Sequence, residues 1–143
     1  MNRQGLQRAG LAAVMLGAAA GPVTLASAHD GHAGKETIVP VMKQAIPEAP
    51  GHTAQIITVN YGPGQASDAH MHPGSIFAYV LEGEVVSQLD GQTPRTYRSG
   101  ESWYEPPGTR HLVSRNASAT ASAKLLVVAI VNGQAPVKRS LSQ

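Results

Sequence analysis

The sequence predicts an all-β domain, built as a sandwich or a small barrel, and three observations support this fold class. From Gln55 onward, short β-branched and aromatic runs alternate with glycine, proline, asparagine and aspartate, which is typical of strands separated by turns. No stretch has the apolar periodicity of an amphipathic helix of three turns. With 143 residues, the chain is long enough for one domain with a hydrophobic core and too short for two.

The first 28 residues have the pattern of a secretory signal peptide. Arg3 and Arg8 precede an apolar run over residues 11–20, and Ala-Ser-Ala at 26–28 has the small-x-small form of a cleavage site. The apolar run is shorter than the roughly 20 residues needed to span a bilayer. We therefore expect residues 1–28 to be removed during export, leaving a periplasmic or secreted protein without a membrane anchor.

Charge and cysteine content exclude several classes of function. The net charge of +2 falls to 0 once residues 1–28 are removed, because that segment contains two arginines and no acidic residue. A nucleic-acid partner would require a basic face, and no cluster of lysine and arginine with interleaved aromatic residues is present. The chain has no cysteine, which rules out disulfides, thiolate metal sites and a cysteine nucleophile. A small molecule is the expected partner.

Residues 29–50 are small and polar, and several glycines and prolines interrupt them, so they are predicted to form a flexible arm. Cleavage after Ala28 would place His29 and His32 at the new amino terminus, where the amine and two imidazoles could bind copper or nickel. Such histidine-containing arms are common, and this terminal site is a secondary hypothesis.

The barrel is predicted to span residues 51–132, followed by a C-terminal tail at 133–143. The expected strands are 56–59, 76–81, 85–89, 95–98, 102–105 and 125–131, the last apolar enough to be buried on both faces. Asp90 and Gly91 predict a tight hairpin because both tolerate positive φ. Residues 106–108, Pro-Pro-Gly, predict a sharp corner, and residues 117–123 contain only alanine, serine and threonine, which suits a loop.

Three of the six histidines are candidates for a metal site. His70 and His72 are two residues apart, so an extended segment would project both imidazoles from the same face. His111 follows the Pro-Pro-Gly corner and begins another strand, from which it could present a third nitrogen. Three nitrogen ligands suffice for an open site. An isolated pair with this spacing is more often a surface or hydrogen-bonded feature, so the surrounding residues decide between the two interpretations.

Those surrounding residues resemble the two signature motifs of the cupin superfamily. The first motif is matched by Gly64, His70, His72 and Gly83, with Ile76 in the place of a glutamate. The second is matched by Gly100, Pro106, Gly108 and His111, while its usual asparagine falls at Arg115, one residue before Asn116. The resemblance extends over residues 55–131, and residues 84–99 separate the motifs, a spacing typical of compact single-domain members.

This resemblance implies an antiparallel jelly-roll β-barrel of six to eight strands that holds one divalent metal ion through His70, His72 and His111. Glycines at positions 83 and 100 would form sharp corners that a Cβ would obstruct. Homodimers are frequent in this family through edge strands that would otherwise be exposed, so a homodimer is expected.

The isoleucine at position 76 cannot coordinate a metal ion. The site would then keep its full positive charge and an open position, which suits a bidentate anionic ligand or a water made acidic by the metal. A site without carboxylate disfavours magnesium and calcium, whereas iron, nickel, copper, zinc and manganese are not distinguished by the sequence.

Ile76, Glu105 and Gln65 are the pocket candidates beside the histidines. Glu105 could act as a proton acceptor or as an outer partner of the metal ligands. Because strand parity leaves its face open, a solvated carboxylate is the interpretation we favour. The aromatic residues Tyr79, Trp103 and Tyr104 are expected in the barrel wall or a subunit interface, with pocket lining as the alternative.

Three functional hypotheses follow from these residues. The first is an exported metal-dependent enzyme that acts oxygenolytically on a small molecule in an apolar pocket. The second is a non-catalytic barrel that binds or senses a metal ion or small ligand, and the third gives the histidines no metal at all. Neither motif contains an obvious general base, which disfavours isomerisation. The sequence does not separate the first two, because the fold and ligands would be shared.

Overall fold

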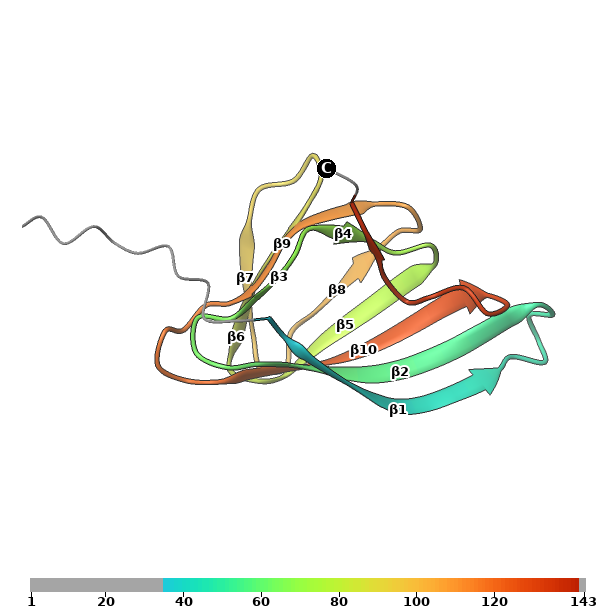
Figure 1. The fold of residues 1–143 in the computed structure, drawn as a ribbon, viewed down its shortest axis with the longest axis horizontal. Helices are drawn as coiled ribbons and strands as arrows, with labels where there is room; N and C mark the ends of the chain where they lie inside the picture. Colours follow the sequence, from blue (N-terminus) through green and yellow to red (C-terminus); the bar gives the residue numbers. More distant parts are fainter. Residues whose placement is uncertain (1–34, 142–143) are drawn as a thin grey trace, which may run out of the picture.

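The structure, a computed structural model, describes residues 35–141 of the chain, and its regular elements are all β-strands (Figure 1). The predicted signal peptide at 1–28 and residues 29–34 of the predicted arm lie outside the described residues. Within the described part of the chain, no helix is long and apolar enough to cross a membrane. The all-β fold class is confirmed.

The strands form two antiparallel sheets that face each other (Figure 1). The first sheet contains, in spatial order, β1 (Thr37–Ala45), β2 (His52–Tyr61), β10 (Ala123–Asn132), β5 (Ser75–Glu82) and β8 (Ser102–Glu105). The second contains β11 (Arg139–Ser140), β4 (His70–Met71), β9 (Arg110–Asn116), β6 (Glu84–Leu89) and β7 (Arg95–Arg98), with β3 (Ala66–Ser67) paired to β9. This arrangement is the predicted antiparallel jelly roll.

The hydrophobic core lies between the sheets, because alternate residues of each strand point inward. In β10, buried residues alternate with half-buried ones up to the exposed Asn132 at its end. The prediction that this strand is buried on both faces was therefore wrong, since the outer face of the first sheet remains uncovered. The apolar core consists of Ile57, Val59, Tyr61, Ile76, Ala78, Val80, Val85, Ala123, Leu125, Val127, Ala129 and Val131.

The strands predicted within the barrel all occur, and β7 and β8 have the predicted bounds. The predicted tight hairpin at Asp90 and Gly91 is instead a longer loop over residues 90–94, in which only Gly91 has a positive φ, 76°. The loop is longer because the β6–β7 register begins at Ser87, which pairs with Arg95.

Gly83 marks the point where the chain passes from β5 in one sheet to β6 in the other. Its φ is +71°, and a Cβ there would lie 2.5 Å from the carbonyl oxygen of Ser122, so the corner requires glycine both for its conformation and for space. The corner at Gly100 differs from the prediction. Its φ of +90° requires glycine, but the nearest atom to a Cβ would be the Tyr79 hydroxyl at 4.0 Å.

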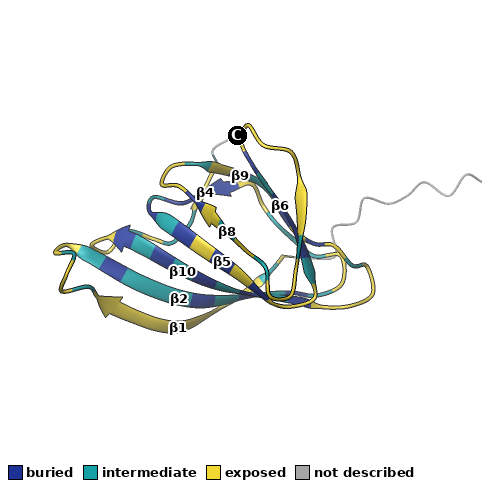
Figure 2. Ribbon diagram, turned by 180° about the vertical axis from the view of Figure 1, so that it is seen from behind, coloured by how far each residue is buried: buried dark blue, intermediate teal, exposed yellow. Residues whose placement is uncertain are grey.

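Residues 37–45 form an edge strand, whereas the sequence predicted a flexible arm over residues 29–50. β1 pairs with β2 from Thr37 opposite Asn60 to Ala45 opposite Thr53. Pro40 is accommodated because the register shifts at this edge position. All of β1 is exposed (Figure 2). Because β1 is exposed along its whole length, its sequence lacks the alternation of polar and apolar residues by which half-buried strands are recognised.

The predicted C-terminal tail is also partly ordered into the fold. β11 pairs with β4, with Ser140 opposite His70. Ala135 and Val137 pack against the hydrophobic core. The tail therefore closes one edge of the second sheet beside the first of the candidate histidines.

Candidate metal centre

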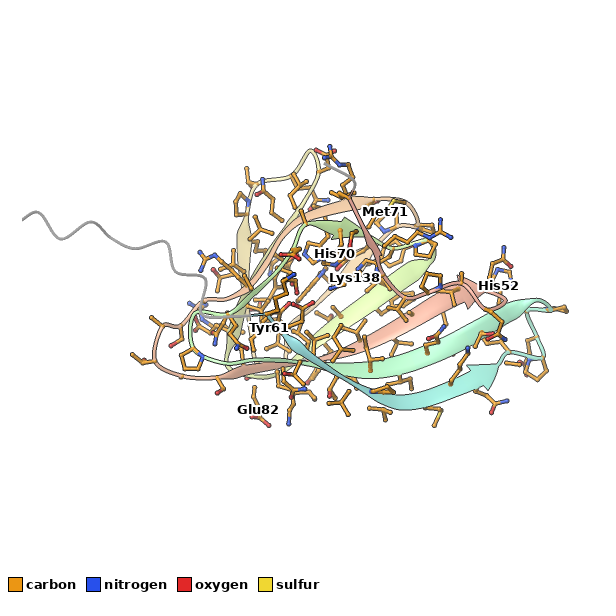
Figure 3. The ribbon with its side chains drawn as sticks, viewed as in Figure 1. His52, Tyr61, His70, Met71, Glu82 and Lys138 are labelled. Atoms are coloured by element: carbon orange, nitrogen blue, oxygen red, sulfur yellow. The ribbon has the colours of Figure 1, made fainter. Side chains whose placement is uncertain are left out.

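The structure brings His70, His72 and His111 together in the space between the sheets. His70 on β4 lies directly opposite His111 on β9 in the antiparallel register. The three residues are 5%, 6% and 3% exposed, and their possible ligand atoms all lie within 4.8 Å of one another. Figure 3 shows His70 beside Lys138 between the sheets, whereas Met71 lies farther out.

Backbone carbonyls orient two of these imidazoles. His70 Nδ1 lies 2.7 Å from the carbonyl oxygen of Asp68, and His72 Nδ1 lies 2.5 Å from that of Val137. A carbonyl only accepts, so each Nδ1 carries the proton and each Nε2 keeps its lone pair. The two Nε2 atoms are 3.1 Å apart. Both lone pairs are therefore available to one shared metal ion.

The third imidazole is held by a side chain. His111 Nε2 lies 2.9 Å from the hydroxyl oxygen of Ser87, which can accept its proton. The other ring nitrogen, Nδ1, is buried and has no hydrogen-bond partner. Buried nitrogens are rarely left without a partner. A buried nitrogen that faces a carboxylate without a hydrogen bond, next to two others with free lone pairs, fits a metal ligand.

Glu105 is buried in this cluster, so the favoured interpretation as a solvated carboxylate was wrong. It is 2% exposed, and its Oε1 accepts a hydrogen bond of 2.8 Å from the indole N–H of Trp103. The same oxygen lies 3.2 Å from His111 Nδ1, and Oε2 lies 3.4 Å from His72 Nε2. Oε2 has no hydrogen-bond partner.

The electrostatic environment keeps these groups in the states that metal binding requires. Burial lowers the pKa of His70 to about 4, and the neighbouring His72 and His111 contribute to the shift. Burial likewise lowers the pKa of His72. For Glu105, burial raises the pKa, but the facing imidazoles of His111 and His72 and the indole of Trp103 outweigh it and hold the pKa below its ordinary value. Near neutral pH, His70 and His72 are neutral and Glu105 is ionised.

The cluster opens onto a cavity of about 300 Å³ between the sheets, at the lower end of the range for small-molecule sites. Its walls are mainly apolar and include Ile57, Val59, Ile76, Ala78, Leu125 and Val127. Ile76, one of the pocket candidates, is among these lining residues. Gln65 does not line this cavity; its Oε1 accepts a 2.8 Å hydrogen bond from the Gly62 N–H and closes a local turn.

Residues from the predicted arm and tail complete the cavity. Glu36 accepts a 2.5 Å hydrogen bond from the Lys138 ammonium, which joins the chain before β1 to the chain before β11. Val137, whose carbonyl holds His72, is the neighbouring lining residue. The sequence did not indicate Glu36, Val137 or Lys138 as site residues. Two isolated charged residues and a backbone carbonyl belong to no motif, so no sequence pattern marks them.

Other residues singled out from the sequence have structural positions. Trp103 lines the cavity, the alternative considered for it, whereas Tyr79 and Tyr104 are exposed. Asn116 is buried and donates to the carbonyls of Gly62 and Ala121, so it fixes the loop after β9. Arg115, at the position of the motif asparagine, is exposed.

A comparison with protein families shows a match between residues 57–129 and the cupin domain. A comparison with curated proteins found no match. The matched range contains the three histidines, Ile76 and Glu105, whereas Glu36, Val137 and Lys138, which complete the cavity, lie outside it.

Several solved structures are similar to this chain. A protein of Thermus thermophilus is 32% identical, with a TM-score of 0.54, over 69% of this chain and 85% of that protein. An uncharacterized protein of Klebsiella pneumoniae with a double-stranded β-helix domain is 18% identical, with a TM-score of 0.59, over 78% of this chain and 88% of that one. An oxalate oxidase in complex with glycolate is 22% identical, with a TM-score of 0.57, over 74% of this chain and 55% of the oxidase. The last two likenesses establish the fold alone.

Proposed function

The chain belongs to the cupin domain family, and from this premise we propose that it is a metal-dependent oxygenase acting on a small, largely apolar molecule. The observation that supports this most directly is the placement of three imidazoles, two of them with free Nε2 lone pairs, in the wall of a mainly apolar cavity. Imidazole nitrogens suit iron, nickel, copper, zinc and manganese. A bound transition metal ion would supply Lewis acidity and redox chemistry.

The residues of this chain would hold the substrate and exclude water. Ile57, Val127 and their apolar neighbours would enclose the hydrocarbon body of the substrate. Because the three histidines border this cavity, an oxygen atom of a bound substrate would lie next to their imidazoles. The substrate would therefore need an apolar body and an oxygen atom that reaches the imidazoles. A molecule with an acidic enol or phenol and a second oxygen beside it meets both requirements.

A non-catalytic metal-binding or sensing barrel is the alternative function. It is favoured by the burial of the three histidines and by the Glu36–Lys138 ion pair beside the cavity, since an enclosed site would retain its ion. The two functions predict different observations. The oxygenase turns over a substrate, whereas the binding barrel retains its metal tightly without turnover.

Oxygen uptake distinguishes these functions. We expect the protein loaded with iron, manganese, nickel or copper to consume dioxygen with at least one member of a panel of β-diketones and catechols, which are bidentate oxygen ligands. An Ala78→Leu variant, which narrows the cavity, should lower kcat/KM by about tenfold or more while metal content is unchanged. Metal retention with no uptake for any substrate and metal combination would favour the binding barrel.

We also propose that the protein is a homodimer in which a second copy covers β1. This strand is exposed along its length and contains Ile38, Val39, Val41 and Met42, which are all more than two-fifths exposed. A long apolar edge strand is a ready site for strand pairing or packing with another chain.

Light scattering coupled to size exclusion tests this proposal. The protein is expected to elute with twice the mass of one chain, and Val41→Lys should shift it to a monomer by placing a charge on the covered strand. Thr96→Lys adds the same charge to β7, the edge strand of the other sheet, and should leave the dimer intact. A monomeric unaltered protein would overturn the proposal.

A further inference from the structure

Glu105 lies beside the position where the family pattern places a glutamate and this chain has an isoleucine. Ile76 on β5 and Glu105 on β8 are direct partners in the antiparallel register. Both side chains point into the space between the sheets, and they are 1% and 2% exposed. A carboxylate is therefore present next to the expected place, but it comes from the adjacent strand.

Both oxygens of this carboxylate lie beside histidines, and one of them is left without a hydrogen bond. Oε1 is engaged by Trp103, whereas Oε2 is buried without a hydrogen bond, 3.4 Å from His72 Nε2. Among the described residues, no lysine or arginine forms an ion pair with Glu105; its ionic neighbours are His72 and His111. A buried carboxylate without a cationic partner is costly unless a cation or further hydrogen bonds balance it.

The free atoms of the cluster form a set of four. They are the Nε2 atoms of His70 and His72, the Nδ1 atom of His111 and the Oε2 atom of Glu105. In each of these residues the other nitrogen or oxygen is held from outside the cluster, by Asp68, Val137, Ser87 and Trp103 respectively. Such outer hydrogen bonds are the usual means by which metal ligands are oriented.

We propose that Glu105 supplies a carboxylate ligand to the metal ion, so that the site has three imidazoles and one carboxylate although the motif glutamate is replaced by Ile76. This inference rests on the proposed metal centre and specifies its ligand set. It also changes the charge expected from the sequence: a divalent ion in this site would leave a net charge of +1 instead of +2. An anionic oxygen ligand favours harder ions such as manganese and ferrous iron relative to copper.

Metal affinity of matched variants tests the inference. Titration of the metal-free protein with manganese should give a Kd at least about tenfold weaker for Glu105→Gln than for the unaltered chain, because the amide keeps the shape but loses the charge. Glu82→Gln removes an exposed carboxylate on the outer side of the same sheet (Figure 3) and should leave the Kd unchanged. The paramagnetic resonance spectrum of bound manganese should change only in Glu105→Gln.

A double variant, Ile76→Glu with Glu105→Gln, returns the carboxylate to the motif position and should recover most of the manganese affinity. Stability separates a ligand from a merely structural residue. Without metal, Glu105→Gln should be at least as stable as the unaltered protein, because it removes a buried charge with incomplete partners. With saturating manganese, it should be the less stable of the two.

The outcomes distinguish this inference from the proposed function. If Glu105→Gln binds manganese with unchanged Kd and spectrum, the inference fails while the metal centre stands. If the unaltered protein binds no transition metal, both fail. If Glu105→Gln does not fold, Glu105→Met, which removes the carboxylate and keeps a side chain of similar length, replaces it, and an unchanged Kd and spectrum in that variant would likewise overturn the inference.

Discussion

Replacing His70 and His72 together by alanine is expected to lower the metal content from about one transition metal ion per chain to none. The two residues provide adjacent nitrogens with free lone pairs, 3.1 Å apart. Without them, one imidazole and the Glu105 carboxylate remain in the cluster, and two ligands are too few to hold an ion against dilution. Elemental mass spectrometry of the purified protein, before and after loading with metal, gives the measurement.

His52→Ala is the matched control for this double variant. His52 begins β2 at the far end of the first sheet from His70 (Figure 3), so its removal should leave the metal content unchanged. Equal metal content in the double variant and the control would show that the ion binds elsewhere. The absence of metal from the unaltered protein, even after loading, would contradict the metal centre itself.

Removal of metal is expected to lower the melting temperature by about 10 °C or more. The donor residues come from strands far apart in the sequence, and β4 and β9 meet only in the folded chain. An ion that binds only the folded state stabilises it by about 2.7 kcal/mol when its free concentration is 100 times Kd. For a domain of this size, each kcal/mol corresponds to roughly 4–8 °C.

Thermal unfolding of the metal-free and the loaded protein, followed by circular dichroism, gives this shift. The His70→Ala, His72→Ala double variant should melt at one temperature with or without metal, because it has lost the binding site. A melting temperature of the unaltered protein that does not change with metal concentration would mean that the ion, if bound, contributes nothing to the folded state.

The sequence predicted the strands of the barrel well, because β-branched runs between glycines and prolines reflect burial on one face. The predicted strands at 95–98 and 102–105 match the structure. Strand β1 was missed because neither of its faces is buried. The predicted export of the mature chain remains a prediction, since residues 1–28 lie outside the described part.

The candidate site was predicted in part. The spacing of His70 and His72 on an extended segment was enough to place both imidazoles together. The orientation of Glu105 was not predictable from the sequence. In the short strand Ser102–Glu105, the two adjacent aromatic residues point to opposite faces, so the sequence does not show which face is buried. The carbonyl of Val137 could not be anticipated either, since a backbone group has no signature in a sequence.

The register that pairs Ile76 with Glu105 has an evolutionary consequence. If one ion needs one carboxylate, either of these two positions can supply it. Related chains should then have an acidic residue at one of the two positions and seldom at both, since two adjacent buried carboxylates repel each other. Substitutions at the two positions should then covary. A search for metal-binding relatives that scores only the motif position would discard such chains as degenerate, although their ligand has only moved to the neighbouring strand.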